Sequence, residues 1–155
     1  MHRSVAMVMA VAVAASSCQQ AGPPTDSPGG SPEVQYLTTD DWPYPFSEAV
    51  RVGNMLYLSG QLGTDPATGE LVPGGITAQT RQAMENIREV LERHGSSLQR
   101  VVKCTVMMAH MAEWPQLNEV YASFFPDHFP ARSALGANGL ALGAAVEIEC
   151  WATVG

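Results

Sequence analysis

Hydrophobic and polar residues alternate with a period of two near the C-terminus of the chain. Between residues 146 and 153 the even-numbered positions are apolar, and the odd-numbered positions are larger or more polar. Val146, Ile148, Cys150 and Ala152 alternate with Glu147, Glu149, Trp151 and Thr153. This alternation predicts a β-strand with one buried face. Glu147 and Glu149 are expected to project together from the other face.

Further strands are predicted upstream. Segments 49–52 and 55–59 flank Gly53-Asn54, which suits the two-residue turn of a β-hairpin because both residues tolerate positive φ. Residues 34–39 and 131–135 are also predicted to be strands. Segment 101–108 is nearly continuous in apolar character, as expected of a central strand covered on both sides.

Two segments carry apolar residues at helical spacing. Residues 77–94 place apolar side chains on one face, and Gly95 follows as the C-cap. Residues 113–125 form a second predicted helix, which Pro126 ends. The order β, β-hairpin, α, β, α, β, β predicts an α+β domain with a mixed sheet. Two helices cover only one sheet face, so the bare apolar face is expected to be an oligomer interface.

The first 35 residues differ in composition from the rest. Residues 1–17 have a short basic start and an apolar run too short to span a bilayer, which is typical of a secretory signal peptide. The small residues before Cys18 resemble a lipobox, so Cys18 is predicted to be lipidated; the alternative is an ordinary cleaved signal with a free Cys18. Residues 18–35, rich in Pro, Gly and Ser, are predicted to be a flexible tether, and 36–155 the folded domain. The expected location is the cell envelope or periplasm.

Length and charge limit the classes of partner. The chain has 155 residues, of which 46% are hydrophobic, enough for one compact domain. Its formal net charge is −7, and no two Lys or Arg residues are adjacent. Nucleic acid is therefore not expected as a partner, because phosphate binding depends on clustered cations. Contact with a membrane is expected only through the lipid anchor.

Cysteine, histidine and methionine residues suggest weaker hypotheses. Cys104 and Cys150 lie on two predicted strands, where an oxidising compartment permits one disulfide, but two buried free thiols fit the pattern equally well. His110 lies among Met107, Met108 and Met111, which favours core packing over a soft-metal site. No metal or cofactor is expected.

Several motifs in the order of the chain carry a resemblance to one family. They are AVRVGNMLYLSGQLGTDPATGELV, ITAQTRQAMENIREVLERHGSSLQRVVKCTV, NEVYASFF, PARSA and VEIE. Their order and spacing resemble the RidA (YjgF/YER057c/UK114) family of reactive-intermediate deaminases over roughly 120 residues. The resemblance implies a chorismate-mutase-like α+β fold with two helices on one face of the sheet. It also implies a homotrimer with ligand sites in the clefts between subunits.

The resemblance further implies the chemistry and two catalytic residues. Family members hydrolyse enamines and imines such as 2-aminoacrylate and 2-iminobutyrate to 2-keto acids and ammonia, without a cofactor. The arginine of PARSA is Arg132, which holds the substrate carboxylate; a planar guanidinium suits that role. The first acid of VEIE is Glu147, expected to activate the attacking water. The stretch 129–154 thus sets Arg132 against a strand that carries two acids.

Four more residues are carried over as substrate contacts: Ser59, Gly60, Asn118 and Phe46. The family's PYSQ motif reads Pro45-Phe46-Ser47-Glu48 in this chain. Phe46 therefore lacks the hydroxyl of the family's tyrosine, and Glu48 places a carboxylate where the family has a glutamine. Structural alternatives also exist for these positions: a hairpin exit for Ser59-Gly60, an exposed helical position for Asn118, and a solvent-facing strand residue for Glu147.

Two classes of function fit these residues. The first is an enamine/imine deaminase; the second is a non-catalytic envelope protein that binds small carboxylates in the same intersubunit cleft. RNA cleavage, attributed to some relatives, is disfavoured by the acidic charge.

Overall fold

A computed structural model describes residues 30–155 of the chain, and its compact unit runs from Pro32 to Gly155. The predicted signal peptide, Cys18 and most of the predicted tether lie outside the described residues. Val34 and Gln35, the last two residues of that tether, belong to the first strand, because they pair with Val52 and Arg51. Among residues 30–155, no helix has the length and apolar character needed to cross a membrane.

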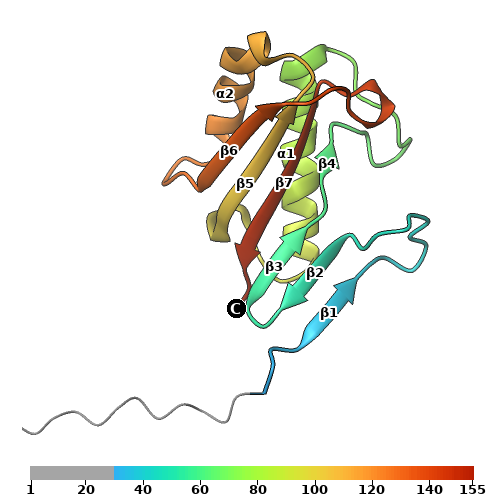
Figure 1. Ribbon diagram of the computed structural model, residues 1–155, viewed down its shortest axis with the longest axis vertical. Helices are drawn as coiled ribbons and strands as arrows, with labels where there is room; N and C mark the ends of the chain where they lie inside the picture. The colour runs from blue at the N-terminus through green and yellow to red at the C-terminus, as the bar shows by residue number, and fades with distance from the viewer. Residues whose placement is uncertain (1–29) are drawn as a thin grey trace, which may run out of the picture. The chain divides into compact units, whose positions relative to one another are not determined.

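Seven strands form one mixed sheet (Figure 1), and six of them follow the order β1-β2-β3-β7-β5-β6, while β4 also pairs with β7. The strands are β1 Val34–Leu37, β2 Ala49–Val52, β3 Met55–Leu58, β4 Gln61–Leu62, β5 Val101–Met108, β6 Ala131–Gly136 and β7 Val146–Thr153. All pairings are antiparallel except that of β5 with β6. The strands predicted at 101–108 and 146–153 are confirmed residue for residue.

The β2–β3 hairpin is confirmed, and Gly53 in its turn has φ 59°, a left-handed conformation that glycine adopts without strain. The strand predicted at 55–59 ends one residue earlier. Ser59 and Gly60 interrupt it, and the chain resumes pairing as the short strand β4.

Two α-helices cover one face of the sheet: α1 spans Gly75–Arg93 and α2 spans Trp114–Ser123. Figure 1 shows α1 lying behind the strands. Core residues of α1, including Met84, Ile87 and Leu91, are fully buried in one cluster with Val106 and Ile148 of the sheet. Burial of these apolar side chains supplies most of the driving force for folding.

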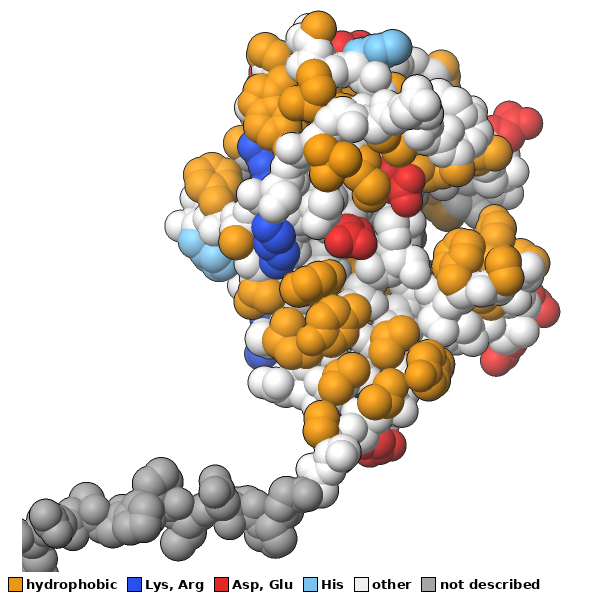
Figure 2. All heavy atoms as spheres, viewed as in Figure 1, with side chains coloured by type: hydrophobic (Ala, Val, Ile, Leu, Met, Phe, Trp, Pro, Cys, Tyr) orange, Lys and Arg blue, Asp and Glu red, His pale blue; other side chains and the backbone are white. Residues whose placement is uncertain are grey.

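The opposite face of the sheet is not covered by any described segment of the same chain. On β5, Val106 and Met108 are buried, whereas Thr105 and Met107 are only half-buried. The prediction that this strand is covered on both sides is therefore wrong for the single chain. Figure 2, seen from the same side as Figure 1, shows hydrophobic side chains on this open face with acidic side chains between them.

A disulfide joins Cys104 of β5 to Cys150 of β7, residues that are direct partners in the antiparallel ladder. Both side chains are fully buried in the core beneath the helices. The structure thus decides between the two alternatives that the sequence left open for these cysteines.

Candidate functional site

Arg132 lies on β6, and helix α2 determines how its guanidinium is held. Trp114 and Tyr121 lie on one side of α2 with Asn118, because positions separated by three and four residues share a helix face. The guanidinium carbon lies 4.7 Å from the ring centroid of Trp114 and 4.6 Å from that of Tyr121. Its Nη2 donates a hydrogen bond of 2.7 Å to Oδ1 of Asn118. Cation–π contacts and this bond fix the orientation of Arg132.

A cavity of about 320 Å³ opens beside this guanidinium, and it will be called the arginine cavity. Its lining includes Asn118, Tyr121, Phe129 and Arg132. Burial raises the pKa of Tyr121 to about 12, although Arg132 acts in the opposite direction, so the phenol stays neutral. Its buried hydroxyl has no hydrogen-bond partner among the described residues. The arginine cavity therefore presents a fixed cation and an unused polar group.

Glu147 lies on β7 beside the interruption between β3 and β4. A Cβ atom on Gly60 would stand 2.1 Å from Oε1 of Glu147, so a larger residue at position 60 would displace this carboxylate from its position. The pKa of Glu147 is raised above its usual value, mainly because burial removes water from the carboxylate and also because Glu149 repels its charge. In the described part of the chain, no group donates a hydrogen bond to it.

Arg132 and Glu147 lie on opposite faces of the sheet within one chain. Side chains of directly paired residues point to the same face; Arg132 is paired with Cys104 of the helix-covered face, whereas Glu147 is paired with Met107 of the open face. The expectation that segment 129–154 sets Arg132 against the two acids is therefore wrong for a single chain. One chain holds two separate halves of the predicted site.

Asn118, Gly60, Ser59 and Phe46 divide between these two halves. Asn118 contacts Arg132, whereas Gly60 contacts Glu147. The Ser59 hydroxyl donates a hydrogen bond of 2.7 Å to the carbonyl oxygen of Ser47, so it ties the hairpin exit to the preceding segment. Phe46 is 51% exposed on that segment. Trp114 and Tyr121 were missed as site residues, because the apolar pattern of 113–125 indicated only packing.

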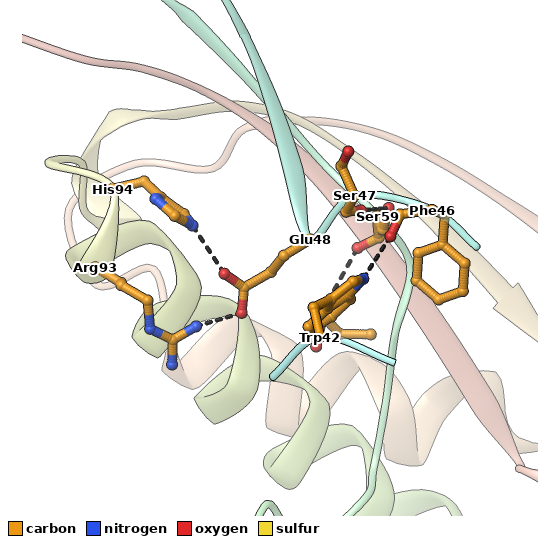
Figure 3. Close-up of polar contacts among 8 residues, drawn as sticks. Trp42, Phe46, Ser47, Glu48, Ser59, Arg93 and His94 are labelled. Atoms are coloured by element: carbon orange, nitrogen blue, oxygen red, sulfur yellow. Dashed lines mark hydrogen bonds and ion pairs between the residues drawn. The ribbon is translucent and has the colours of Figure 1, made fainter. Parts of the chain in front are cut away.

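Glu48 anchors the segment before β2 to helix α1 (Figure 3). Its carboxylate is buried and forms an ion pair with Arg93 and a contact of 2.8 Å with Nε2 of His94. Both partners lie at the C-terminal end of α1, where a cation is also favoured by the helix dipole. The indole Nε1 of Trp42 donates to the carbonyl oxygen of Phe46. A carboxylate at position 48 thus has a structural role.

Residues 30–155 contain no group of three His, Cys, Asp or Glu side chains placed to hold a metal ion. Core packing is confirmed for Met108, which is fully buried, but Met111 is 44% exposed and does not belong to the core.

Comparisons with known proteins agree on one family. The model of the family described as Endoribonuclease L-PSP, the RidA/YjgF family, matches residues 41–154. Over 111 residues the chain is 45% identical to a 2-iminobutanoate/2-iminopropanoate deaminase of Capra hircus, covering 72% of this chain and 81% of the relative. Over 110 residues it is 42% identical to Reactive Intermediate Deaminase A, chloroplastic, of Arabidopsis thaliana, covering 71% of this chain and 59% of the relative.

Solved structures give the same result. A putative endoribonuclease from Thermotoga maritima has a TM-score of 0.73 and 42% identity, with 78% of this chain and 98% of that chain covered. RidA from the Antarctic bacterium Psychrobacter has a TM-score of 0.72 and 40% identity, with 77% and 99% covered. This chain therefore belongs to the RidA family and has its chorismate-mutase-like α+β fold.

Proposed function

We propose that this protein is a cofactor-independent imine deaminase, which hydrolyses 2-imino acids and the enamines in equilibrium with them to 2-keto acids and ammonia. Relatives at 40–45% identity carry the name 2-iminobutanoate/2-iminopropanoate deaminase. The observation that carries the proposal is Arg132: the described residues accept only one of its five N–H donors, and the others remain for a carboxylate in the arginine cavity.

Glu147 supplies proton transfer in this proposal. As the oxygen of water bonds to C2 of the imine, the C=N electron pair moves to nitrogen, and Glu147 takes a proton from the water. Glu147 returns that proton to nitrogen, giving a carbinolamine. The C–N bond then breaks as the hydroxyl oxygen forms C=O, its proton passes to the departing nitrogen, and ammonia leaves. The raised pKa of Glu147 suits a group that both takes and gives a proton during the reaction.

We propose that the complete site is formed by two chains of a homotrimer. Arg132 and Glu147 lie on opposite faces of the sheet in one chain, so the Arg132 of one subunit must meet the Glu147 of another. The open face also exposes Leu135 at 47% and Trp151 at 39%. Exposed apolar side chains gathered on one face are typical of a subunit interface.

The first experiment tests turnover. A serine or threonine dehydratase generates the enamine in the presence of the purified protein, and the rate of 2-keto acid formation is followed after the dehydratase is inhibited. An imine deaminase hydrolyses the enamine and imine to the 2-keto acid faster than solvent alone does. A protein that binds 2-keto acids without this acceleration supports the alternative function, a non-catalytic carboxylate-binding protein.

The second experiment tests the shared site. Arg132→Ala and Glu147→Gln chains, each inactive alone, are refolded together in equal amounts. If one chain supplies Arg132 and its neighbour Glu147, random mixing restores about a quarter of the wild-type sites. A site built within one chain gives no recovery, and light scattering that shows a stable monomer contradicts the homotrimer.

We also propose that the protein is exported and anchored through a lipid on Cys18. The Cys104–Cys150 disulfide supports an oxidising compartment, because such bonds are rare in reducing cytosol. The residues before Cys18 support lipidation. Cys18→Ser is expected to move the protein from the detergent phase to the aqueous phase, whereas unchanged partitioning contradicts the anchor.

A further inference from the structure

A second, larger cavity of about 450 Å³ lies beside Gly60, where the chain passes from β3 to β4 along β7. It will be called the aromatic cavity. One part of its lining is formed by Trp42, Tyr44 and Phe46, which will be called the aromatic wall, and another part by Ala141 and Leu142. Its size falls in the range of small-molecule sites, and its lining is largely apolar.

The aromatic wall is preassembled. The rings of Tyr44 and Phe46 stack with centroids 5.3 Å apart, and Trp42 packs edge-on against Tyr44 at 5.1 Å. Tyr44 and Phe46 nevertheless remain 55% and 51% exposed. The anchor at Glu48 holds the chain that carries them, through Arg93 and His94 (Figure 3). Aromatic side chains held rigidly but left uncovered are suited to receive an apolar ligand.

The part of the lining formed by Ala141 and Leu142 has an unusual backbone conformation. Leu142 has φ 59°, and it is the one described residue other than glycine with positive φ. Its side chain is 69% exposed, so packing within the chain does not explain why a leucine occupies a position that glycine adopts without strain. Strain of this kind collects at ligand sites, where the side chain contributes to binding.

The aromatic cavity adjoins the Glu147 half of the site through Gly60. Gly60 lines the cavity, and the Glu147 carboxylate fills the space where a Cβ of Gly60 would stand. Leu62, also in the lining, is paired with Glu147 in the β4–β7 ladder. A substrate whose C2 lies at Glu147 therefore has this cavity next to its reacting carbon.

We propose that the aromatic cavity receives the side chain of the 2-imino acid and selects substrates with bulky apolar side chains, aromatic or branched, over those with a methyl or ethyl group. This inference rests on the proposed deaminase function. A methyl group leaves most of the cavity to water, whereas a ring or a branched chain contacts the aromatic wall and Leu142 together. Each additional buried methylene favours the larger substrate.

The test compares imines formed from different amino acids by an L-amino acid oxidase. The protein competes with semicarbazide for each imine, and kcat/KM is obtained for the imines of phenylalanine, leucine and alanine. The wild-type protein is expected to prefer the phenylalanine and leucine imines over the alanine imine by at least about tenfold. Equal values, or a preference for the alanine imine, overturn the proposal.

Two variants and one control locate the preference. Leu142→Gly removes one wall and relieves the positive φ, so its thermal midpoint should not fall; its preference for the leucine imine should drop by about tenfold. Tyr44→Ala, in the aromatic wall, should shift the preference in the same direction. Met111→Ala removes a comparably exposed apolar side chain outside the aromatic cavity and should leave all three values unchanged.

The outcomes separate this inference from the proposed function. If no imine is turned over, the deaminase proposal fails, and calorimetry with phenylpyruvate and pyruvate then tests the aromatic cavity as a binding site for bulky side chains. Tighter binding of phenylpyruvate that Leu142→Gly abolishes supports this role of the cavity. Equal binding of the two 2-keto acids overturns it. If Leu142→Gly changes the molecular mass in light scattering without changing the preference, the cavity is covered by another subunit, and the inference is wrong.

Discussion

The Arg132 half and the Glu147 half of the site are built in contrasting ways. Arg132 is fixed by two aromatic rings and Asn118, all on the face that α1 and α2 cover. Glu147 lies on the open face, where the described part of the chain gives it no hydrogen-bond donor and where Glu149 repels its charge. Within the described residues, the Arg132 side chain is thus held by contacts from its own chain, whereas the Glu147 carboxylate is not.

This contrast fits the roles that the proposed function gives to Arg132 and Glu147. A cation fixed in advance loses little entropy when it binds a carboxylate, so the Arg132 half is suited to affinity and orientation. A carboxylate that burial and a like charge hold at a raised pKa is suited to proton transfer. The following changes, from the largest expected effect to the smallest, test this division.

Glu147→Gln is expected to lower turnover by about a thousandfold, the usual scale for loss of a general base. Because the amide is nearly isosteric with the carboxylate, affinity for a 2-keto acid should change little. Steady-state kinetics and calorimetry on the same preparation check the two quantities. An equal loss of turnover and affinity would show that Glu147 mainly binds the ligand.

Replacing both Cys104 and Cys150 by alanine should lower the free energy of unfolding by about 4 kcal/mol, from the loop-closure entropy of residues 46 apart in sequence. The disulfide joins β5 to β7, and neither cysteine is one of the proposed site residues. Below its unfolding temperature, the variant should therefore keep its activity. Denaturant unfolding with and without reductant measures the effect. A wild-type protein insensitive to reductant throughout its unfolding transition would contradict it.

Arg132→Ala should reduce kcat/KM by about a hundredfold, through loss of a charge-assisted bidentate contact. Arg132→Lys should recover little, since an ammonium does not reproduce the planar fork. Folding is also affected, because the guanidinium packs between Trp114 and Tyr121; we expect a loss of about 1 kcal/mol. Asn118→Ala is the matched control: it frees the guanidinium while keeping the charge, and should have a smaller effect on kcat/KM.

The smallest expected effect is on stability as a function of pH. A carboxyl whose pKa is raised on folding contributes stability below its ordinary pKa and loses it as pH rises through the folded value. Glu147→Gln should therefore gain stability over the wild type near neutral pH, by less than about 1 kcal/mol because solvent screens the half-exposed group. The gain should vanish below about pH 4. Thermal unfolding across this range measures it, and a gain that grows toward acid would contradict the raised pKa.

Much of the fold follows from patterns along the chain. Alternation in 146–153, the Gly53-Asn54 turn and the apolar face of 77–94 each depend on local periodicity, and each appears in the structure. The ends of elements were less predictable: α1 begins at Gly75 rather than 77, and α2 spans 114–123 rather than 113–125.

The site was harder to predict, because its geometry depends on contacts between distant segments. The pairing of Cys104 with Cys150 depends on the register between β5 and β7, which shifts at an irregularity between Val101 and Lys103. Apolar spacing in α2 does not distinguish packing from the enclosure of Arg132. The separation of Arg132 and Glu147 onto opposite faces required the pairing of three strands.

The disulfide has a further consequence for damaged molecules. The loop between Cys104 and Cys150 contains both Arg132 and Glu147, as well as the exposed residues Phe129 and Leu142. Proteases cut exposed loops first. A cut near Leu142 leaves Arg132 on one fragment and Glu147 on the other, yet sulfur still joins the two. Such a nicked chain migrates as a single species on a denaturing gel until a thiol is added.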